Sequence, residues 1–336
     1  MKTCKITALL LAVCMMATFI GCEKKKESTE KPAYVIMVNA MNGLSVYEQQ
    51  SEAARKAAKD YGIKLEITGP STEDKLSDIK AIIEAYKTEM KNAIAKKPDA
   101  IICEPFDSEI YSSVTEAKKA GIPVFCTSNG TETAEDYISC IGTDNVEYGK
   151  RAADLLAEKM GNKASVLAVL SEENSQNQTV QLAEFKKQCA EKYPEIVVAD
   201  TISDRADVDT AKDLFKQKFA ENSKINAVLM LESVGGTVAA DVAKEMQKDI
   251  CILDVDATKE KIEKIISGEE WATLAQNFFK RGYEAVRMAY EYVTKDGKVG
   301  FADFEDSSVV LITKENAADY EQALWDTVRT KGTPWK

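Results

Sequence analysis

The 336-residue chain contains no histidine. This absence excludes Ser-His-Asp and Cys-His catalytic groups, and it excludes every metal site that needs an imidazole ligand. Basic residues are also in the minority, because 44 Lys and Arg stand against 55 Asp and Glu and give a net charge of −11. Binding to a phosphate backbone needs a basic face, so we expect no nucleic acid partner.

Paired cysteines and phosphate-binding loops are missing as well. No Cys-x-x-Cys pattern occurs among the eight cysteines, and Gly235-Gly236 fits no phosphate-binding fingerprint. We therefore expect no disulfide framework, no metal and no cofactor. Most of the cysteines after residue 22 lie within or at the ends of apolar runs, where free cysteine behaves as a small hydrophobic side chain. These later cysteines are Cys103, Cys126, Cys140, Cys189 and Cys251.

The first residues are typical of an export signal. Lys2 and Lys5 precede an apolar run over residues 6–20, which is too short to span a bilayer well. Gly21-Cys22 follows, and a small residue directly before a cysteine resembles a bacterial lipobox, although Phe19 stands where leucine is usual. The alternative is an ordinary secretory signal with an incidental cysteine.

We expect a lipoprotein signal peptide over residues 1–21 and lipidation of Cys22. Residues 22–32 are rich in charge and Ser/Thr, which predicts a solvated tether. Removal of the signal takes away two lysines and no acid, so the mature chain would carry a net charge of −13. The protein would then be anchored to the cell membrane by lipid and would face the periplasm or the cell exterior.

From Tyr34 onward, short apolar runs alternate with amphipathic helical stretches. This alternation indicates βαβ units, parallel sheets and helices on both faces of each sheet. More than ten strands are too many for one compact twisted sheet, so we expect two doubly wound α/β lobes. The predicted strands are residues 34–40, 63–68, 100–103, 122–127, 137–141, 164–170, 195–200, 226–231, 250–254, 271–275 and 307–312. The predicted helices are residues 45–61, 73–96, 108–120, 145–160, 176–192, 208–221, 234–247, 258–267 and 279–295, with one more after Lys314.

Nearly every predicted strand ends in a hydrogen-bonding side chain. Ligands of open parallel sheets bind beyond the carboxyl ends of the strands, so these side chains are candidates for a binding site. The same residue types are common helix caps, so a structural role stays open at each position. The strand ends concerned are Asn39 and Asn42, Glu104 to Asp107, Ser128-Asn129, Glu232-Ser233, Asp254 to Asp256 and Gln276-Asn277.

Several stretches resemble the type I periplasmic binding proteins of bacterial sugar importers, the ribose- and galactose-binding group. The lactose-type repressors share this ligand-binding fold. The resemblance extends from about residue 33 to residue 312. It implies two α/β lobes joined by three chain crossings that close over a ligand. The resembling stretches are PDAIICEPFDSE (98–109), AKKAGIPVFCTSN (117–129), IGTDNVEYGKRAADLL (141–156), INAVLMLES (225–233), ICILDVDAT (250–258) and ATLAQNFFKRGYEAV (272–286).

On this template, lobe one would comprise residues 33–141 with 277–306. Lobe two would comprise residues 142–276 with 307–336. Asp256 falls at a sugar-binding aspartate and Gln276 at a sugar-binding glutamine of the ribose-type pattern.

Other positions match the ribose-type pattern less closely. Tyr47 lies near a ring-stacking aromatic residue, with core packing as the alternative, and Glu232 lies at a polar position that is asparagine in the ribose proteins. Ser128 and Asn129 stand where those proteins have an Asp-Arg pair, a departure that argues against ribose itself. Arg205 lies near a position of lobe two that lines the pocket, with a surface salt bridge as the alternative.

The chemistry of these residues suits a neutral polyol. A carboxylate such as Asp256 accepts strong charge-assisted hydrogen bonds from hydroxyls, and an amide such as Gln276 both donates and accepts. Tyr47 can cover an apolar sugar face. A metal site at Asp254 and Asp256 is the alternative, but no further ligands cluster nearby in the sequence.

We therefore expect a monomeric solute-binding protein, not an enzyme, that delivers a small sugar or polyol to the permease of an ABC importer. Two alternatives remain open. The first is a sensor that presents a sugar, a nucleoside or a sugar-like signal to a chemoreceptor or histidine kinase. The second is a carboxylate-based glycosidase. The export signal and the missing DNA-binding segment exclude a repressor.

Overall fold

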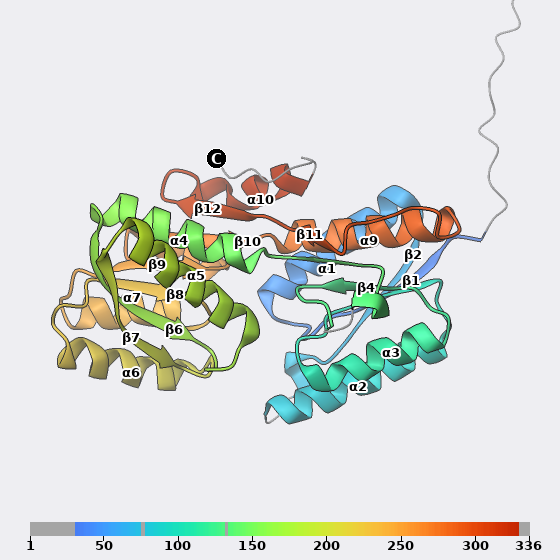
Figure 1. The fold of residues 1–336 in the computed structure, drawn as a ribbon, viewed down its shortest axis with the longest axis horizontal. Helices are drawn as coiled ribbons and strands as arrows, with labels where there is room; N and C mark the ends of the chain where they lie inside the picture. The colour runs from blue at the N-terminus through green and yellow to red at the C-terminus, as the bar shows by residue number, and fades with distance from the viewer. Residues whose placement is uncertain (1–30, 75–77, 132–133, 329–336) are drawn as a thin grey trace, which may run out of the picture. The chain divides into compact units, whose positions relative to one another are not determined.

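The computed structural model describes residues 31–74, 78–131 and 134–328. The predicted signal peptide, Cys22 and nearly all of the predicted tether lie outside the described residues. Within them, strands and helices alternate along the chain, as the sequence predicts (Figure 1).

The strands form two sheets, each with six of the described strands. The first sheet has the order β11-β5-β4-β3-β1-β2, and the second has the order β12-β10-β9-β8-β6-β7. The first sheet contains β1 (Tyr34–Val38), β2 (Lys64–Thr68), β3 (Ala100–Cys103), β4 (Val124–Thr127), β5 (Ser139–Gly142) and β11 (Phe304–Asp306). The second contains β6 (Lys163–Leu170), β7 (Glu195–Ser203), β8 (Ala227–Met230), β9 (Cys251–Val255), β10 (Ala272–Gln276) and β12 (Val309–Thr313).

Parallel pairing predominates in both sheets, which confirms the predicted α/β class. Strands β3 and β8 are apolar throughout and buried on both faces, and this composition is typical of parallel sheets covered by helices. One pairing differs from the prediction, because β12 runs antiparallel to β10, with Gln276 opposite Val309. The short edge strand β11 was not predicted from the sequence.

Helices cover both faces of each sheet (Figure 1). In the first sheet, residues of α1 and α9 form one core cluster and residues of α2 and α3 form the other. In the second, α4 packs against α5, and α6 packs against α7. The helices are α1 (Ser45–Tyr61), α2 (Ile79–Ala95), α3 (Tyr111–Lys119), α4 (Asn145–Met160), α5 (Gln176–Lys192), α6 (Val208–Glu221), α7 (Gly235–Glu245), α8 (Lys259–Ser267), α9 (Phe278–Thr294) and α10 (Tyr320–Val328).

Helix boundaries follow the local sequence signals. Helix α4 begins after Asp144, whose carboxylate accepts hydrogen bonds from the backbone N–H groups of Val146 and Glu147, and it ends at Gly161 in the left-handed conformation. Helix α2 is shorter than the predicted 73–96, because Asp78 caps it and accepts a hydrogen bond from the N–H of Ala81.

The chain passes between the two sheets three times. The crossings lie between β5 and α4, between β10 and α9, and between β11 and β12. Each follows the carboxyl end of a strand, so these crossings lie beside the edge at which open α/β sheets bind ligands.

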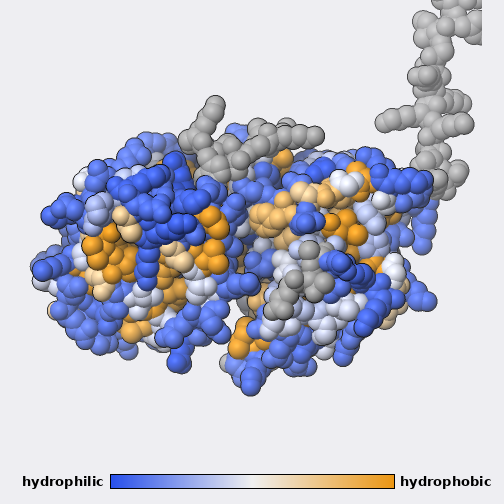
Figure 2. Space-filling view, in the orientation of Figure 1, coloured by the Kyte–Doolittle hydropathy of each residue, from blue (hydrophilic) through white to orange (hydrophobic). Residues whose placement is uncertain are grey.

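Charged and polar residues cover most of the face that Figure 2 shows, with smaller apolar areas between them. Within the ranges that the structure describes, no helix is long and apolar enough to cross a membrane.

Candidate functional site

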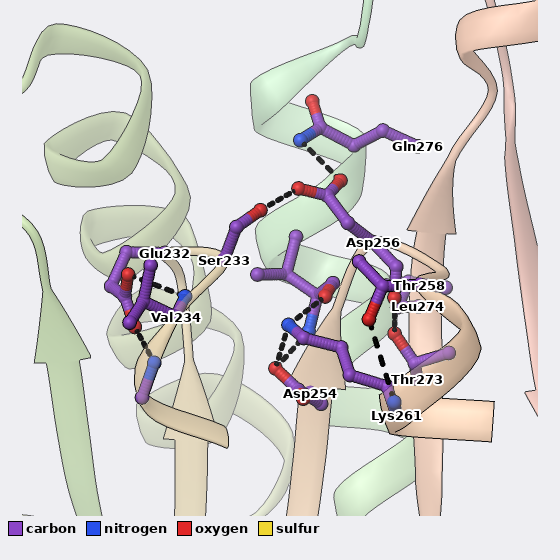
Figure 3. Close-up of polar contacts among 12 residues, drawn as sticks. Glu232, Ser233, Val234, Asp254, Asp256, Thr258, Lys261, Thr273, Leu274 and Gln276 are labelled. Carbon is purple, nitrogen blue, oxygen red and sulfur yellow. Dashed lines mark hydrogen bonds and ion pairs between the residues drawn. The ribbon is translucent and has the colours of Figure 1, made fainter. Parts of the chain in front are cut away.

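Asp256 stands just beyond the carboxyl end of β9 and is the centre of the candidate site (Figure 3). Only 4% of its surface is exposed. One carboxylate oxygen, Oδ2, accepts a hydrogen bond from the hydroxyl of Ser233, and the other, Oδ1, accepts one from Nε2 of Gln276 at 3.0 Å. The carboxylate is thus held by two neutral donors and by no cation within salt-bridge distance among the described residues.

The backbone at Asp256 is fixed in an uncommon conformation. Its φ of 61° lies in the left-handed region, which aspartate tolerates better than most residues other than glycine. Its carbonyl oxygen accepts a hydrogen bond from the hydroxyl of Thr273 on the neighbouring strand β10 at 2.6 Å. This bond locks the loop after β9 to the sheet and sets the direction of the Asp256 side chain.

Gln276 is the last residue of β10 and joins Asp256 to the first sheet. Its Oε1 accepts a hydrogen bond from the hydroxyl of Thr143, which follows β5, at 2.8 Å. The amide therefore donates on one side and accepts on the other, as a hydroxyl-binding group must. A hydroxyl of a bound molecule can replace either partner without leaving the amide unsatisfied.

Helix capping does not explain these two side chains. The cap of α8 is Thr258, whose hydroxyl accepts from the N–H of Lys261 at 3.4 Å, and the cap of α9 is Asn277, whose Oδ1 accepts from the N–H of Lys280 at 2.8 Å. Asp256 and Gln276 each precede these capping residues and accept from side chains instead.

Glu232, by contrast, does cap a helix. Its carboxylate accepts from the N–H of Val234 at 2.7 Å and from the N–H of Gly235 at the start of α7 (Figure 3). Burial, followed by the charge of the neighbouring Asp204, raises the pKa of Glu232 to about 7. The position is therefore structural in this conformation, with a carboxyl group that titrates near neutrality.

Asp254 points into the protein and makes a buried ion pair. Its Oδ1 lies 2.9 Å from Nζ of Lys261, and the Lys261 ammonium also donates to the carbonyl of Val255 at 2.6 Å. The Asp254 carboxylate is therefore neutralised by a lysine. The parts of the chain that the structure describes contain no cluster of three or more acids and cysteines able to hold a metal.

Tyr47 in α1 and Glu104, directly after β3, lie together at the carboxyl edge of the first sheet. The Tyr47 hydroxyl donates to Oε1 of Glu104 at 3.1 Å, and its ring packs edge-on against Phe278 with the centroids 6.0 Å apart. Burial raises the pKa of Tyr47 well above its usual range, with Glu104 adding to the shift and Asp256 making a smaller contribution. The pKa of Tyr47 therefore responds to the charge on Asp256, which follows β9 of the second sheet.

Arg281 and Thr143 are site residues that the sequence analysis missed, and Arg281 is the less expected of the two. It is the largest fully buried side chain among the described residues, with 1% of its surface exposed, and its guanidinium carbon lies 4.1 Å from the centre of the Phe278 ring. Its charge lowers the pKa of Glu104 and of Tyr47, in both cases against a larger opposing effect of burial. An arginine in an amphipathic helix is usually exposed, so the sequence carried no signal of this placement.

Ser128 and Asn129 lie directly beyond β4 and are partly buried. The Ser128 hydroxyl is near enough to Glu104 to lower its pKa. Ser128 adopts a left-handed φ of 67°, and its backbone packs so closely on Gly142 that a Cβ there would collide with the Ser128 carbonyl. The structure thus brings Ser128 to the same corner as Glu104 and Tyr47.

Arg205 lies apart from the other candidates. It is exposed, in a left-handed turn after β7 with φ of 59°, and its backbone N–H donates to the carbonyl of Ser171 at 2.9 Å. Among the described contacts, its side chain makes none with Asp256, Gln276 or Glu232.

A cavity of about 580 Å³ lies at the opposite, amino ends of β9 and β10. Trp271 is part of its lining, and Nζ of Lys159 lies 5.6 Å from the centre of the Trp271 ring. None of the predicted site residues lines this cavity. We therefore place the candidate site at the polar cluster beyond the carboxyl ends of β9 and β10.

Comparison with known proteins identifies the family to which this fold belongs. The sequence profile described as "Periplasmic binding protein domain" matches residues 35–298. The ribose import binding protein of Haemophilus influenzae is 24% identical over 275 residues, covering 81% of this chain and 87% of that protein. The D-apiose import binding protein of Actinobacillus succinogenes is 23% identical over 234 residues, covering 68% of this chain and 74% of that protein.

A solved structure shows the same fold. The ABC transporter solute-binding protein from Agrobacterium vitis, bound with α-D-tagatopyranose, superposes with a TM-score of 0.77 at 22% identity and covers 89% of this chain and all of that chain. The profile match extends over most of the chain, from residue 35 to residue 298. The structure has two sheets, three crossings between them and polar residues beyond the carboxyl ends of the strands. The chain therefore belongs to the periplasmic binding protein family, whose relatives include the sugar-binding proteins of ABC importers.

Proposed function

We propose that this protein is a lipid-anchored, extracytoplasmic solute-binding protein that captures a small neutral sugar and delivers it to the permease of an ABC importer. The observation that carries the proposal is the cluster of Asp256, Gln276, Ser233 and Thr143. It combines a carboxylate, an amide and two hydroxyls within direct hydrogen-bond distance of one another. The carboxylate accepts hydrogen bonds, while the amide and the two hydroxyls can both donate and accept. Such a mixture suits a sugar, because each of its hydroxyls also both donates and accepts.

The proposed site spans two lobes, built on the first and second sheets. Tyr47 and Glu104 belong to the first lobe, while Asp256 and Gln276 belong to the second. At this edge Nε2 of Gln49 in the first lobe donates to the carbonyl of Ala257 in the second at 2.9 Å, and Thr143, in the crossing that follows β5, donates to Gln276. A sugar that bonds to both lobes would stabilise the closed arrangement by its higher affinity for that state.

The relatives support a transport role, because those named above are import binding proteins of ribose and D-apiose. This chain would act in the same way by binding and release, with no bond made or broken, and as a monomer. A turnover assay on nitrophenyl glycosides should detect no hydrolysis. Hydrolysis that is lost in Asp256→Asn would show a glycosidase instead.

The test of the binding function starts from the protein as purified. Mass spectrometry of the denatured protein should release a sugar, and calorimetric titration should detect binding of at least one of D-ribose, D-apiose, D-arabinose, D-xylose, D-galactose, D-glucose and D-tagatose. Binding of none of these sugars, with no sugar carried through purification, would contradict the proposal. A bound nucleoside or signalling compound would favour the sensor alternative.

The anchor needs its own experiment, in cells that express the full chain. Cys22→Ser should leave the precursor unprocessed or release the protein from the membrane fraction. The matched control is Cys251→Ser, since Cys251 is a partly buried thiol of β9 and has no part in anchoring. Identical membrane retention and gel mobility for wild type and Cys22→Ser would contradict lipidation.

A further inference from the structure

Arg281 is a buried cation that forms no salt bridge with any acidic residue in the described part of the chain. No carboxylate among the described residues lies within 4.0 Å of its guanidinium, and its Nε is buried without a hydrogen-bond acceptor. The guanidinium lies over the face of the Phe278 ring. Placing a charged group in the interior is costly unless it is paired, so an unpaired buried arginine needs a reason.

Arg287 on the same helix shows the ordinary arrangement. Its guanidinium is paired on both sides, with Glu284 at 2.6 Å and with Glu291 at 2.9 Å. It lies two turns along α9 and remains partly exposed. The contrast shows that glutamates of α9 can form ion pairs with an arginine of the same helix, as they do with Arg287 but not with Arg281.

Glu104 is the acidic counterpart in the same corner. It is 4% exposed, and its Oε1 accepts from Tyr47 while its Oε2 is buried without a partner. Burial raises the pKa of Glu104, and the Arg281 charge opposes that rise, so the two groups act on each other across more than salt-bridge distance. A cationic donor and a carboxyl acceptor therefore lie near each other with buried atoms that the protein leaves unpaired.

A hydroxyl group matches such a pair. Its oxygen accepts from the guanidinium and its hydrogen donates to the carboxylate, and two neighbouring hydroxyls of a sugar can do both at once. An anionic group would satisfy Arg281 but would face Glu104 and Asp256. Phe278 and Tyr47, which pack edge-on, supply apolar surface beside the pair.

We propose that Arg281 and Glu104 bind two adjacent hydroxyl groups of a neutral sugar and so determine the specificity of the first lobe. The inference rests on the proposed function, and it names the class of ligand, a neutral sugar with adjacent free hydroxyls.

The experiment compares Arg281→Met with Arg287→Met. Each is titrated with the seven sugars named above and with D-gluconate and D-glucuronate, and each is melted without sugar. Arg281→Met should weaken binding of the preferred neutral sugar roughly 10- to 100-fold, as expected for loss of a charged hydrogen-bonding partner. Its melting temperature without sugar should stay the same or rise, because an unpaired buried charge is removed. Arg287→Met should bind as the wild type does.

Arg281→Lys is a second variant that keeps the inference testable if Arg281→Met does not fold. Lysine retains the positive charge and the alkyl chain but lacks the planar guanidinium with its several fixed donors. Arg281→Lys should fold, as judged by far-ultraviolet circular dichroism, and should still bind at least fivefold more weakly. Neutral-sugar affinity within threefold of wild type in either folded variant would overturn this inference and leave the proposed function intact. Tighter wild-type binding of gluconate or glucuronate than of any neutral sugar would also overturn it. A wild type that binds none of the nine compounds and carries no sugar through purification would overturn both proposals.

Discussion

Nε2 of Gln276 donates a 3.0 Å hydrogen bond to Oδ1 of Asp256, so the polar residues at the ends of β10 and β9 form one unit. Two strand ends that are 20 residues apart in sequence thus present one surface to a ligand. This pairing explains why each strand finishes in a polar side chain that caps no helix.

Gln276→Ala should weaken sugar binding by about tenfold or less, because a neutral hydrogen bond contributes roughly 0.5–1.5 kcal/mol. The double variant with Asp256→Asn should depart from additivity by more than about 0.5 kcal/mol, since the two side chains contact each other. Calorimetric titration of both single variants and the double variant measures this coupling. Strict additivity would indicate that they do not act on one ligand together.

Gly236→Ala should destabilise the protein by about 1–3 kcal/mol, as overpacking does. A Cβ at Gly236, in the first turn of α7, would collide with the Asp254 carboxylate, which the buried Lys261 holds in place. Helix propensity alone predicts the opposite sign, since alanine is favoured over glycine by about 1 kcal/mol. Urea unfolding decides, with Gly300→Ala as the control because nothing lies within 4 Å of a Cβ there.

Lys261→Met should cost about 3–5 kcal/mol, because it leaves the fully buried Asp254 carboxylate without its cation. The matched control is Lys264→Met, one turn further along α8. Lys264 pairs near the surface with Asp241 at 2.5 Å and with Glu269 at 2.6 Å, and such pairs contribute about 1 kcal/mol or less. Similar losses for both variants in urea unfolding would contradict the assignment of Lys261 to a buried pair.

The stability of the protein should fall as the pH rises from about 5 to 9. Burial, followed by the charge of Asp254, raises the pKa of Glu270 to about 9, and burial raises the pKa of Asp254 to about 6. With Glu232 at about 7, the folded state holds protons that the unfolded state has released above pH 4.5. Because the folded state binds more protons than the unfolded state, the free energy of unfolding decreases as the pH rises. Each group contributes to this decrease until the pH has passed its pKa in the folded state.

Glu270→Gln tests this account of pH dependence. It should flatten the fall of the melting temperature between pH 7 and 9, because the neutral amide no longer titrates. Glu269→Gln is the control, since Lys264 donates to Glu269 and lowers its pKa. A melting temperature of the wild type that rises steadily from pH 5 to 9 would contradict the raised pKa values.

Local signals in the sequence were enough to predict most of the elements. The bounds of α4 and α5 match the predictions, because each helix carries its own apolar period and its own end signals. The antiparallel direction of β12 was not predicted, since strand direction follows from where the chain crosses, which no short pattern encodes. The short strand β11 carries too few residues for an alternating pattern.

The candidate site was predictable only in part. Asp256 and Gln276 belonged to the set of polar strand ends expected at one edge of a parallel sheet, and the resemblance to the ribose-type proteins singled them out from that set. Arg281 was not found, because its helix presents several charged residues and only the fold shows which of them is buried. Glu104 was noted as a strand end, but its neighbours Tyr47 and Arg281 come from helices far away in the sequence.

The most direct test of the central claim is calorimetric titration of Asp256→Asn beside the wild type, with the sugar that the wild type binds most tightly. Asparagine tolerates the left-handed backbone at this position and keeps the shape of the side chain, so the change removes the charge and one of the two acceptor oxygens. We predict roughly tenfold weaker binding, since a hydrogen bond to a charged group exceeds a neutral one by about 1–1.5 kcal/mol, with an unchanged melting temperature in the absence of sugar. Unchanged affinity in Asp256→Asn would contradict the assignment of Asp256 to the sugar.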